Sequence, residues 1–332
     1  MSQKVSMKSI AKELGVSIAL VSYVLNGKLT HRISPATAER IRALADKYNY
    51  TPNQIAKSLK TNKTYTLGLI VADISNIFYS ELAQHIEEEA QNHGYNVIFA
   101  SAYEDSEKFK SILDVFVAKQ VDGLILAVPA GADIYIQSVD QAAIPYVIID
   151  REFEGIDPIK IININNYEAS ASVVHHLYTA GFKRPGAIAL KSDLLHLKDR
   201  KTGFIDSVAQ YDYDQSFFYE IAEKELEEKI EDCILNAIKI DKVDSLFFLT
   251  SRIAMAGLAI LAKYNVRVPK EVGVVCFDES HAYKIFNTPL TYVKQPLEEM
   301  SKAAVHLLIN SITPEAKLNF NTQLIIKEST CL

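Results

Sequence analysis

Several signals of common protein classes are missing from this sequence of 332 residues. No apolar run approaches the roughly 20 residues that a membrane-spanning helix needs. The first residues, MSQKVSMKSIAKELGVS, are interrupted by Lys8, Lys12 and Glu13, so they lack the apolar core of a secretory signal. We therefore expect a protein that works in the cytoplasm, without a membrane partner.

Cysteine is scarce, and the motifs of common catalytic sites are absent. Cys233, Cys276 and Cys331 lack the spacing of metal ligands, and an odd number of cysteines in a reducing compartment predicts free thiols. No GxGxxG follows a candidate strand, and no Cys/His or Ser/His/Asp motif occurs. We expect no catalytic residues, no bound metal and no cofactor.

The charges are distributed unevenly along the chain. Residues 1–63 hold eleven lysines and arginines against three acids, a net charge of +8, whereas the rest carries −14. A basic head on an acidic body indicates a polyanion as the partner of the head, although charge alone equally permits a solvated basic surface. The hydrophobic content of 48% and the length favour two or three domains with large cores.

The basic segment has the pattern of three short helices. Ser6 or Ser9 can cap the first helix, and Gly15 can end it in a turn with positive φ. Ser17 can cap the second helix, and Ser34–Pro35 starts the third with a cap and a first-turn proline. This arrangement predicts a helix-turn-helix domain. The expected core residues are Ile10, Ala11, Leu14, Leu20, Val21, Val24, Leu25, Ala38, Ile41, Leu44, Ala45 and Tyr48.

From Thr66 onward, apolar strands alternate with helices. The expected strands are residues 67–71, 97–99, 123–126, 146–149, 187–190, 246–249 and 272–275. Continuous apolar runs separated by helices predict parallel sheets that are covered on both faces, and there are enough strands for two sheets. The predicted fold class is an all-α helix-turn-helix head plus an α/β body.

Polar residues follow several of these strands. Asp73–Asn76 follows the first strand and Asp150–Arg151 the fourth, and Thr250–Arg252 and Asp278 follow two later strands. Ligands of open α/β sheets bind beyond the carboxyl ends of the strands. Carboxylates accept hydrogen bonds from paired hydroxyls and arginine donates a fork of them, which suits a polyol.

Four spaced stretches carry a family resemblance: MKSIAKELGVSIALVSYVLNG, ISPATAERI, YTPNQIAKSLKT and TLGLIVADISN. With them the chain resembles the lactose- and galactose-repressor (LacI/GalR) family of bacterial transcription regulators, and the resemblance continues to residue 332. It implies a body of periplasmic-binding-protein type with two doubly wound parallel-sheet subdomains. The implied limits are a DNA-binding domain at 1–62 with a hinge helix at about 53–60, and an effector-binding and dimerisation domain at 63–332. The N-subdomain would span about 63–163 and 293–324, and the C-subdomain about 164–292 and 325–332.

The resemblance also implies DNA-facing positions. In the head they are Ser6, Ser17, Ile18, Ala19, Ser22, Tyr23 and Asn26, and in the hinge they are Asn53, Ala56, Lys57 and Leu59. Leu59 would wedge between base steps in the minor groove of the DNA. The family binds a near-palindromic, double-stranded operator, which implies a homodimer or a higher oligomer here. Tyr23 stands where the family usually carries arginine, and the stretch Lys28–Arg32 is longer than usual, so the operator sequence stays open. Core packing for Tyr23 and a plain linker for the hinge are the alternatives.

Effector positions follow from the resemblance in the same way. The matching residues are Phe78, Tyr79, Asp150, His196, Arg200, Ser251, Asp278 and Gln295. For each residue alone, helix capping or an ion pair between subdomains is the alternative, but the set favours a pocket for a sugar or sugar derivative that controls a repressor allosterically. Departures from the family pattern occur at Ile77, Asn165–Asn166 and Arg252.

Arg252 is added to the expected pocket for a separate reason. If Ser251 caps the next helix, Arg252 lies in the first turn, where the helix dipole disfavours a cation. Either an anionic effector binds there, or Arg252 pairs with a surface acid such as Glu279.

Two other function classes compete. Two α/β sheets could belong to a dehydrogenase, which the missing GxGxxG disfavours, or to a secreted sugar-binding protein, which the basic head disfavours. Glu87–Glu89 is interpreted as a solvated helix face, and His175–His176 as a capped or exposed pair.

Overall fold

The computed structural model describes residues 5–26, 32–50, 63–153, 160–310 and 316–331. The chain forms two compact units, Met1–Thr64 and Tyr65–Leu332, which we call the head and the body. No helix in the described ranges is long and apolar enough to cross a membrane.

The head contains α1 (Met7–Leu14), α2 (Ile18–Leu25) and α3 (Pro35–Lys47). The expected caps are present: Ser6 and Ser9 form a reciprocal capping box, Ser17 caps α2 and Ser34 caps α3. Gly15 ends α1 at φ 67°, in the left-handed region that glycine tolerates. The buried core is Ile10, Ala11, Val21, Val24, Ile41 and Ala45, with Leu14, Leu20, Leu25, Ala38 and Leu44 partly buried around it.

Tyr48 is the one expected core residue of the head that lies outside its core. Its side chain is 38% exposed, and its hydroxyl donates to the Glu13 carboxylate at 3.0 and 3.1 Å. Tyr48 follows the last residue of α3, where the helical spacing that placed it on the inner face no longer applies.

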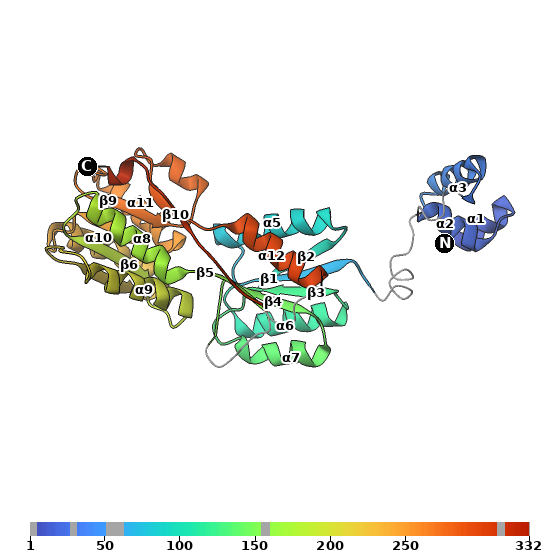
Figure 1. Cartoon of the computed structure of the whole chain (residues 1–332), viewed down its shortest axis with the longest axis horizontal. Helices are drawn as coiled ribbons and strands as arrows, with labels where there is room; N and C mark the ends of the chain where they lie inside the picture. Colours follow the sequence, from blue (N-terminus) through green and yellow to red (C-terminus); the bar gives the residue numbers. More distant parts are fainter. Residues whose placement is uncertain (1–4, 27–31, 51–62, 154–159, 311–315, 332) are drawn as a thin grey trace. The chain divides into compact units, whose positions relative to one another are not determined.

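The body contains two six-stranded sheets with helices on both faces (Figure 1). The first sheet has the order β11-β5-β4-β3-β1-β2 and is parallel throughout. Its strands are β1 (Thr66–Val71), β2 (Asn96–Ser101), β3 (Gly123–Leu126), β4 (Tyr146–Ile149), β5 (Lys160–Ile164) and β11 (Ala316–Phe320). Its helices are α5 (Ile77–Asn92), α6 (Ser106–Ala118), α7 (Ile136–Ala142) and α12 (Leu297–Ile309).

The second sheet repeats this strand order as β12-β10-β9-β8-β6-β7, with only β12 antiparallel. Its strands are β6 (Pro185–Leu190), β7 (Phe217–Ile221), β8 (Ser245–Phe248), β9 (Gly273–Phe277), β10 (Thr291–Lys294) and β12 (Gln323–Ile325). Its helices are α8 (Asn166–Thr179), α9 (Leu195–Val208), α10 (Leu226–Lys239) and α11 (Ser251–Lys263). Short 3-10 turns lie at Asp133–Tyr135, Glu223–Glu225, His281–Ile285 and Glu328–Thr330.

The chain passes between the two sheets three times: from β5 to α8, from β10 to α12, and from β11 to β12 (Figure 1). Each half therefore contains segments that are distant in the sequence. The connections lie close together at the carboxyl ends of β5 and β10, where the polar residues of the body also gather.

The strand at 97–99 is not buried on both faces, although the sequence predicts such burial for the strands of the body. It is β2, at the edge of the first sheet, and Ile98 and Phe99 are 38% and 58% exposed. An edge strand has only one neighbour, so an apolar run in the sequence does not guarantee burial. The three cysteines are free thiols, as expected, and burial raises the pKa of Cys276.

Candidate functional site

A cavity of about 550 Å³ lies at the carboxyl ends of strands from both sheets. The loop after β1, the ends of β4, β8 and β9, and the N-terminal part of α9 all contribute to its lining. The structure brings together all nine residues expected at an effector pocket: Phe78, Tyr79, Asp150, His196, Arg200, Ser251, Arg252, Asp278 and Gln295.

Two aspartates occupy equivalent places in the repeated topology. Asp150 follows β4 and Asp278 follows β9, the third strand in the order of each sheet. Both have φ near 70° (71° and 70°), a left-handed conformation that aspartate adopts more readily than most residues. The chain turns sharply there, and each carboxylate lines the cavity while staying only 7% exposed.

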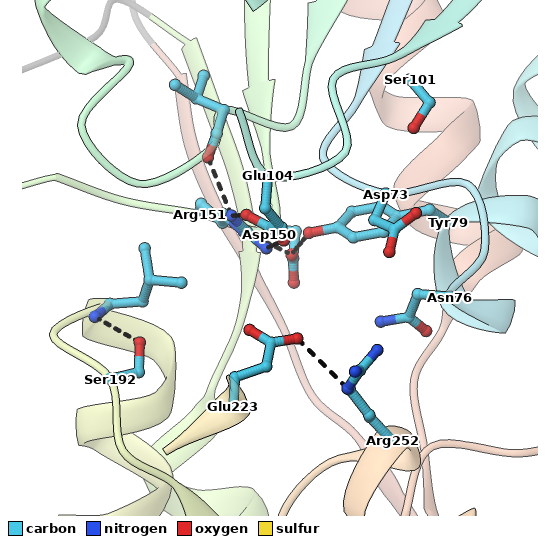
Figure 2. Close-up of polar contacts among 12 residues, drawn as sticks. Asp73, Asn76, Tyr79, Ser101, Glu104, Asp150, Arg151, Ser192, Glu223 and Arg252 are labelled. Carbon is cyan, nitrogen blue, oxygen red and sulfur yellow. Dashed lines mark hydrogen bonds and ion pairs between the residues drawn. The ribbon is translucent and has the colours of Figure 1, made fainter. Parts of the chain in front are cut away.

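Asp150 belongs to a buried network with Tyr79 and Arg151 (Figure 2). The Tyr79 hydroxyl donates to Asp150 Oδ2 at 2.7 Å, and Arg151 Nε lies 3.8 Å from the same oxygen. Arg151 also donates to the Glu104 carboxylate at 2.5 and 2.8 Å. Burial raises the pKa of Asp150, which the Arg151 charge and the Tyr79 hydrogen bond oppose.

Arg200 is held in place from several sides. Its guanidinium stacks 3.5 Å from the ring centre of Phe277, its Nε donates to Asn166 Oδ1 at 2.8 Å, and its Nη1 donates to the Leu249 carbonyl at 2.9 Å. The side chain is 4% exposed, so the protein supplies a cation of fixed position at the cavity wall.

His196 and Gln295 have unused hydrogen-bonding capacity. Burial holds the pKa of His196 well below its usual range, and the nearby Arg200 lowers it further, so the imidazole is neutral. Gln295 donates to Asp278 Oδ1 at 2.6 Å, but its Oε1 accepts no hydrogen bond. Six buried side-chain nitrogen or oxygen atoms in the described ranges have no hydrogen bond, and three lie on cavity residues: Arg151 Nε, His196 Nδ1 and Gln295 Oε1. Buried polar atoms are normally paired, so this concentration marks a place for a polar ligand or water.

The cap of α11 lies one residue earlier than the sequence predicts. Thr250 is the N-cap, because its side chain accepts from the Ile253 amide, and Ser251 is the first helical residue. Both residues carry a hydroxyl, so the sequence could not distinguish them. Arg252 pairs with Glu223, Nε to Oε1 at 3.3 Å (Figure 2), whereas Glu279 bonds Lys294 and Tyr292.

Two acidic residues that line the cavity, Glu104 and Glu223, were not predicted from the sequence. Glu104 lies three residues beyond β2, so the rule about carboxyl ends of strands could have found it. Glu223 follows β7, a strand whose apolar run, Phe217–Ile221, is interrupted by Glu220 and was not recognised.

In the head, α2 buries one face and exposes the other. Val21 and Val24 are buried, whereas Ile18 is 48% and Tyr23 39% exposed. Ser17, Ala19 and Asn26 are also exposed, Ser22 is partly exposed, and the Ser6 and Ser17 hydroxyls are engaged in capping. Exposure rules out core packing for Tyr23. The hinge positions Asn53, Ala56, Lys57 and Leu59 lie outside the described residues.

Two family models match the chain. The model for bacterial regulatory proteins of the lacI family matches residues 6–53, and that for the periplasmic binding protein-like domain matches residues 174–330. The HTH-type transcriptional regulator RegA of Clostridium saccharobutylicum is 31% identical over 336 residues, which cover 98% of this chain and 99% of the relative. Catabolite control protein A of Priestia megaterium is 27% identical over 94% of this chain and 93% of its own length.

Solved structures agree on the fold. The lac repressor dimer bound to operator and the anti-inducer ONPF has a TM-score of 0.83 at 20% identity, covering 99% of this chain and 100% of that one. A periplasmic binding protein/LacI transcriptional regulator from Alkaliphilus metalliredigens, complexed with D-xylulofuranose, has a TM-score of 0.69 at 26% identity, covering 80% and 98%.

These similarities extend over the whole chain and confirm both the predicted fold class and the resemblance that the head and body motifs carried. The chain belongs to the lacI family of bacterial regulatory proteins, and it is a transcription regulator with a helix-turn-helix DNA-binding head and a periplasmic-binding-protein-like body.

Proposed function

We propose that this regulator is a cytoplasmic repressor, without catalytic activity, that binds a near-palindromic operator as a homodimer and responds to a neutral, sugar-like effector. The effector assignment rests on three buried polar atoms that have no hydrogen bond, Arg151 Nε, His196 Nδ1 and Gln295 Oε1, on residues that line one cavity. A ligand rich in hydroxyl groups both donates and accepts hydrogen bonds, which suits a site whose lining residues keep donors and acceptors without a hydrogen bond.

The charges of the lining favour a neutral ligand over an anionic one. Five carboxylates and four basic side chains line the cavity. Arg151 is paired with Glu104, Arg252 with Glu223, and Arg200 is bonded to Asn166 and a backbone carbonyl. An anion would therefore meet no surplus of positive charge. The relative crystallised with D-xylulofuranose indicates a sugar as the ligand class.

Isothermal calorimetry with paired neutral sugars and their phosphate esters tests this assignment. We expect a neutral sugar to bind and Gln295→Leu to weaken it about 10- to 100-fold, because a polar ligand group would then lose its buried partner. Asp193→Asn is the matched control, since Asp193 is fully exposed beside the cavity loop. Preferred binding of the phosphate ester would refute the neutral class, and unchanged binding in Gln295→Leu would refute the cavity assignment.

We propose that α2 reads the operator through its exposed face. Ile18 and Tyr23 are apolar or aromatic side chains that the head leaves in solvent, and the net charge of +8 on residues 1–63 suits a phosphate backbone. Tyr23→Ala should weaken operator binding more than binding to random DNA, and Tyr48→Phe, which removes only a hydroxyl bonded to Glu13, should leave both unchanged. Affinity should fall steeply with salt.

Leu59 remains a proposed minor-groove wedge. Leu59→Ala should reduce specific binding and spare random DNA, because the lost contact depends on bent DNA. Equal loss on both DNAs in a gel-shift titration would identify residue 59 as ordinary linker.

We propose that effector binding closes the two halves of the body and shifts DNA affinity. The Ser251 hydroxyl lies 3.3 Å from Asn76 Oδ1, a contact across the cavity between α11 and the cap of α5. Coupling of this kind is about 1–3 kcal/mol and reciprocal, so operator DNA must change effector affinity by the same factor. A titration of effector with and without operator measures that factor directly.

A further inference from the structure

A second polar cluster lies on the first half of the body, away from the cavity. Glu89 lies on α5, His93 is the residue that follows the end of this helix, and His306 lies on α12. Glu89 Oε1 is 3.0 Å from His93 Nε2 and 2.9 Å from His306 Nε2, and the two nitrogens are 3.1 Å apart. Three potential ligand atoms thus form an almost equilateral triangle.

The fold brings these residues together by two routes. Glu89 and His93 are four residues apart, a spacing that places side chains on the same helix face. His306 comes from α12, which packs against α5, and the two imidazole rings meet edge to face with centroids 5.0 Å apart. The Glu89 side chain is only 12% exposed, so it is not the solvated position expected for the run Glu87–Glu89, whereas both histidines stay accessible at 38% and 48%.

Hydrogen bonds alone cannot account for all three contacts. If each imidazole is neutral and the carboxylate is ionised, each Nε2 carries either a proton or a lone pair. With two protons, the contact between the histidines has two donors and no acceptor. If only one Nε2 carries a proton, the other Nε2 and the carboxylate oxygen are both acceptors, and no proton lies between them. A cation bound by all three atoms accepts the lone pair that each of them turns toward the centre of the triangle.

The triangle also has the size that such a cation needs. Zinc binds histidine nitrogen at about 2.0–2.1 Å and carboxylate oxygen at about 2.0–2.2 Å in tetrahedral geometry, which holds neighbouring ligand atoms about 3.3 Å apart. The observed separations of 2.9 to 3.1 Å require only small side-chain rotations to reach this value. Two imidazoles and one carboxylate are also a ligand set that zinc uses in proteins.

We propose that Glu89, His93 and His306 form a binding site for a divalent transition metal of the zinc class, with a fourth position open to water or an exogenous ligand. The ion would join the C-terminal end of α5 to α12, two helices that cover the first sheet. The site shares no residue with the cavity, so metal and effector would occupy separate places.

Calorimetry of the full-length, metal-free protein with zinc chloride tests the proposal. We expect one equivalent of zinc per chain to bind at this site and to raise the melting temperature of the body, because an ion that binds only the folded state stabilises it. His93→Gln and His306→Gln should each weaken this binding at least about 100-fold, since loss of an outer partner of a ligand already costs 10- to 100-fold.

Two controls separate this site from other zinc-binding groups. His175→Gln removes a histidine on α8 that bonds Tyr211 outside the cluster, and it should bind zinc like the wild type. Cobalt(II) substitution should give a tetrahedral spectrum without a thiolate charge-transfer band, which excludes the three cysteines as ligands. Circular dichroism of the variants checks that they are folded. No zinc binding by the wild type, or binding that survives in both His93→Gln and His306→Gln, would overturn the proposal.

Discussion

Gly203→Ala should destabilise the body and disturb the cavity through helix packing alone. Gly203 lies on α9 where this helix meets α8. A Cβ at this position would lie 3.0 Å from the carbonyl carbon and the Cα of Tyr167, and closer still to the carbonyl oxygen. Ordinary contacts begin at 3.4 Å, and Tyr167 presents backbone here, which cannot rotate away. The two helices would have to separate by about 1 Å.

Three contributions set the size of the loss in stability. Overpacking costs about 1–3 kcal/mol. The separation also stretches the 2.8 Å hydrogen bond from Arg200 on α9 to Asn166 on α8, and a buried bond to a charged group contributes about 1.5–3 kcal/mol. Alanine is favoured over glycine in a helix by about 1 kcal/mol, which offsets part of the loss. We expect a net destabilisation of about 1.5–5 kcal/mol, or a melting temperature lower by about 3–20 °C.

Differential scanning calorimetry of the full chain measures this shift in the transition of the body. Lys201→Ala is the matched control: it lies on the same helix, its side chain is partly exposed and bonded to Glu220, and its loss should matter by less than about 0.5 kcal/mol. A Gly203→Ala protein that melts with or above the wild type would refute the close approach of α8 and α9.

Three further outcomes follow from the described contacts. Ile10→Ala, at a fully buried position of the head, should cost the head about 2–5 kcal/mol and abolish DNA binding, while the calorimetric transition of the body stays unchanged. Ser17→Ala removes the cap of α2 and should cost about 1 kcal/mol, seen as faster amide hydrogen exchange at the start of that helix. Burial holds the pKa of His196 well below 6.5, so below pH 6.5 the unfolded chain binds a proton that the native protein does not. The free energy of unfolding is therefore highest above pH 6.5 with respect to this group, and it falls by up to about 1.4 kcal/mol for each pH unit below that. His196→Gln should flatten that fall in melts at pH 7.5 and 5.5.

The caps and apolar runs were readable from the sequence because they depend on neighbours along the chain. Ser17 directly precedes the helix α2 that it caps. The apolar run at 67–71 forms most of the strand β1. Strands whose apolar pattern is interrupted or bounded by polar residues, such as β7 with Glu220 and β10 with Thr291 and Lys294, could not be recognised locally, because tertiary pairing makes them strands.

The cavity could be predicted in part, for a related reason. Asp150 and Asp278 follow recognisable strands, so topology alone places them at one edge of each sheet. The pairing of Arg252 with Glu223 could not be predicted, because it joins two elements whose separation depends on how α11 lies against the turn after β7. His306 is equally beyond reach, since 213 residues separate it from His93.

The passage from β11 to β12 has a consequence for the order in which this protein is made. β11 completes one edge of the first sheet, and β12 completes the same edge of the second. Both strands come from the last part of the chain, between Ala316 and Ile325. During synthesis, which proceeds from the N-terminus, the head can fold early on its own contacts. Both halves of the body, in contrast, lack one outer strand until this final segment has left the ribosome, and β5 and β10 are edge strands until then. A chain that ends before residue 316 lacks the outer strand of both halves, so premature termination turns the interior strands β5 and β10 into edges that can pair with another chain and aggregate.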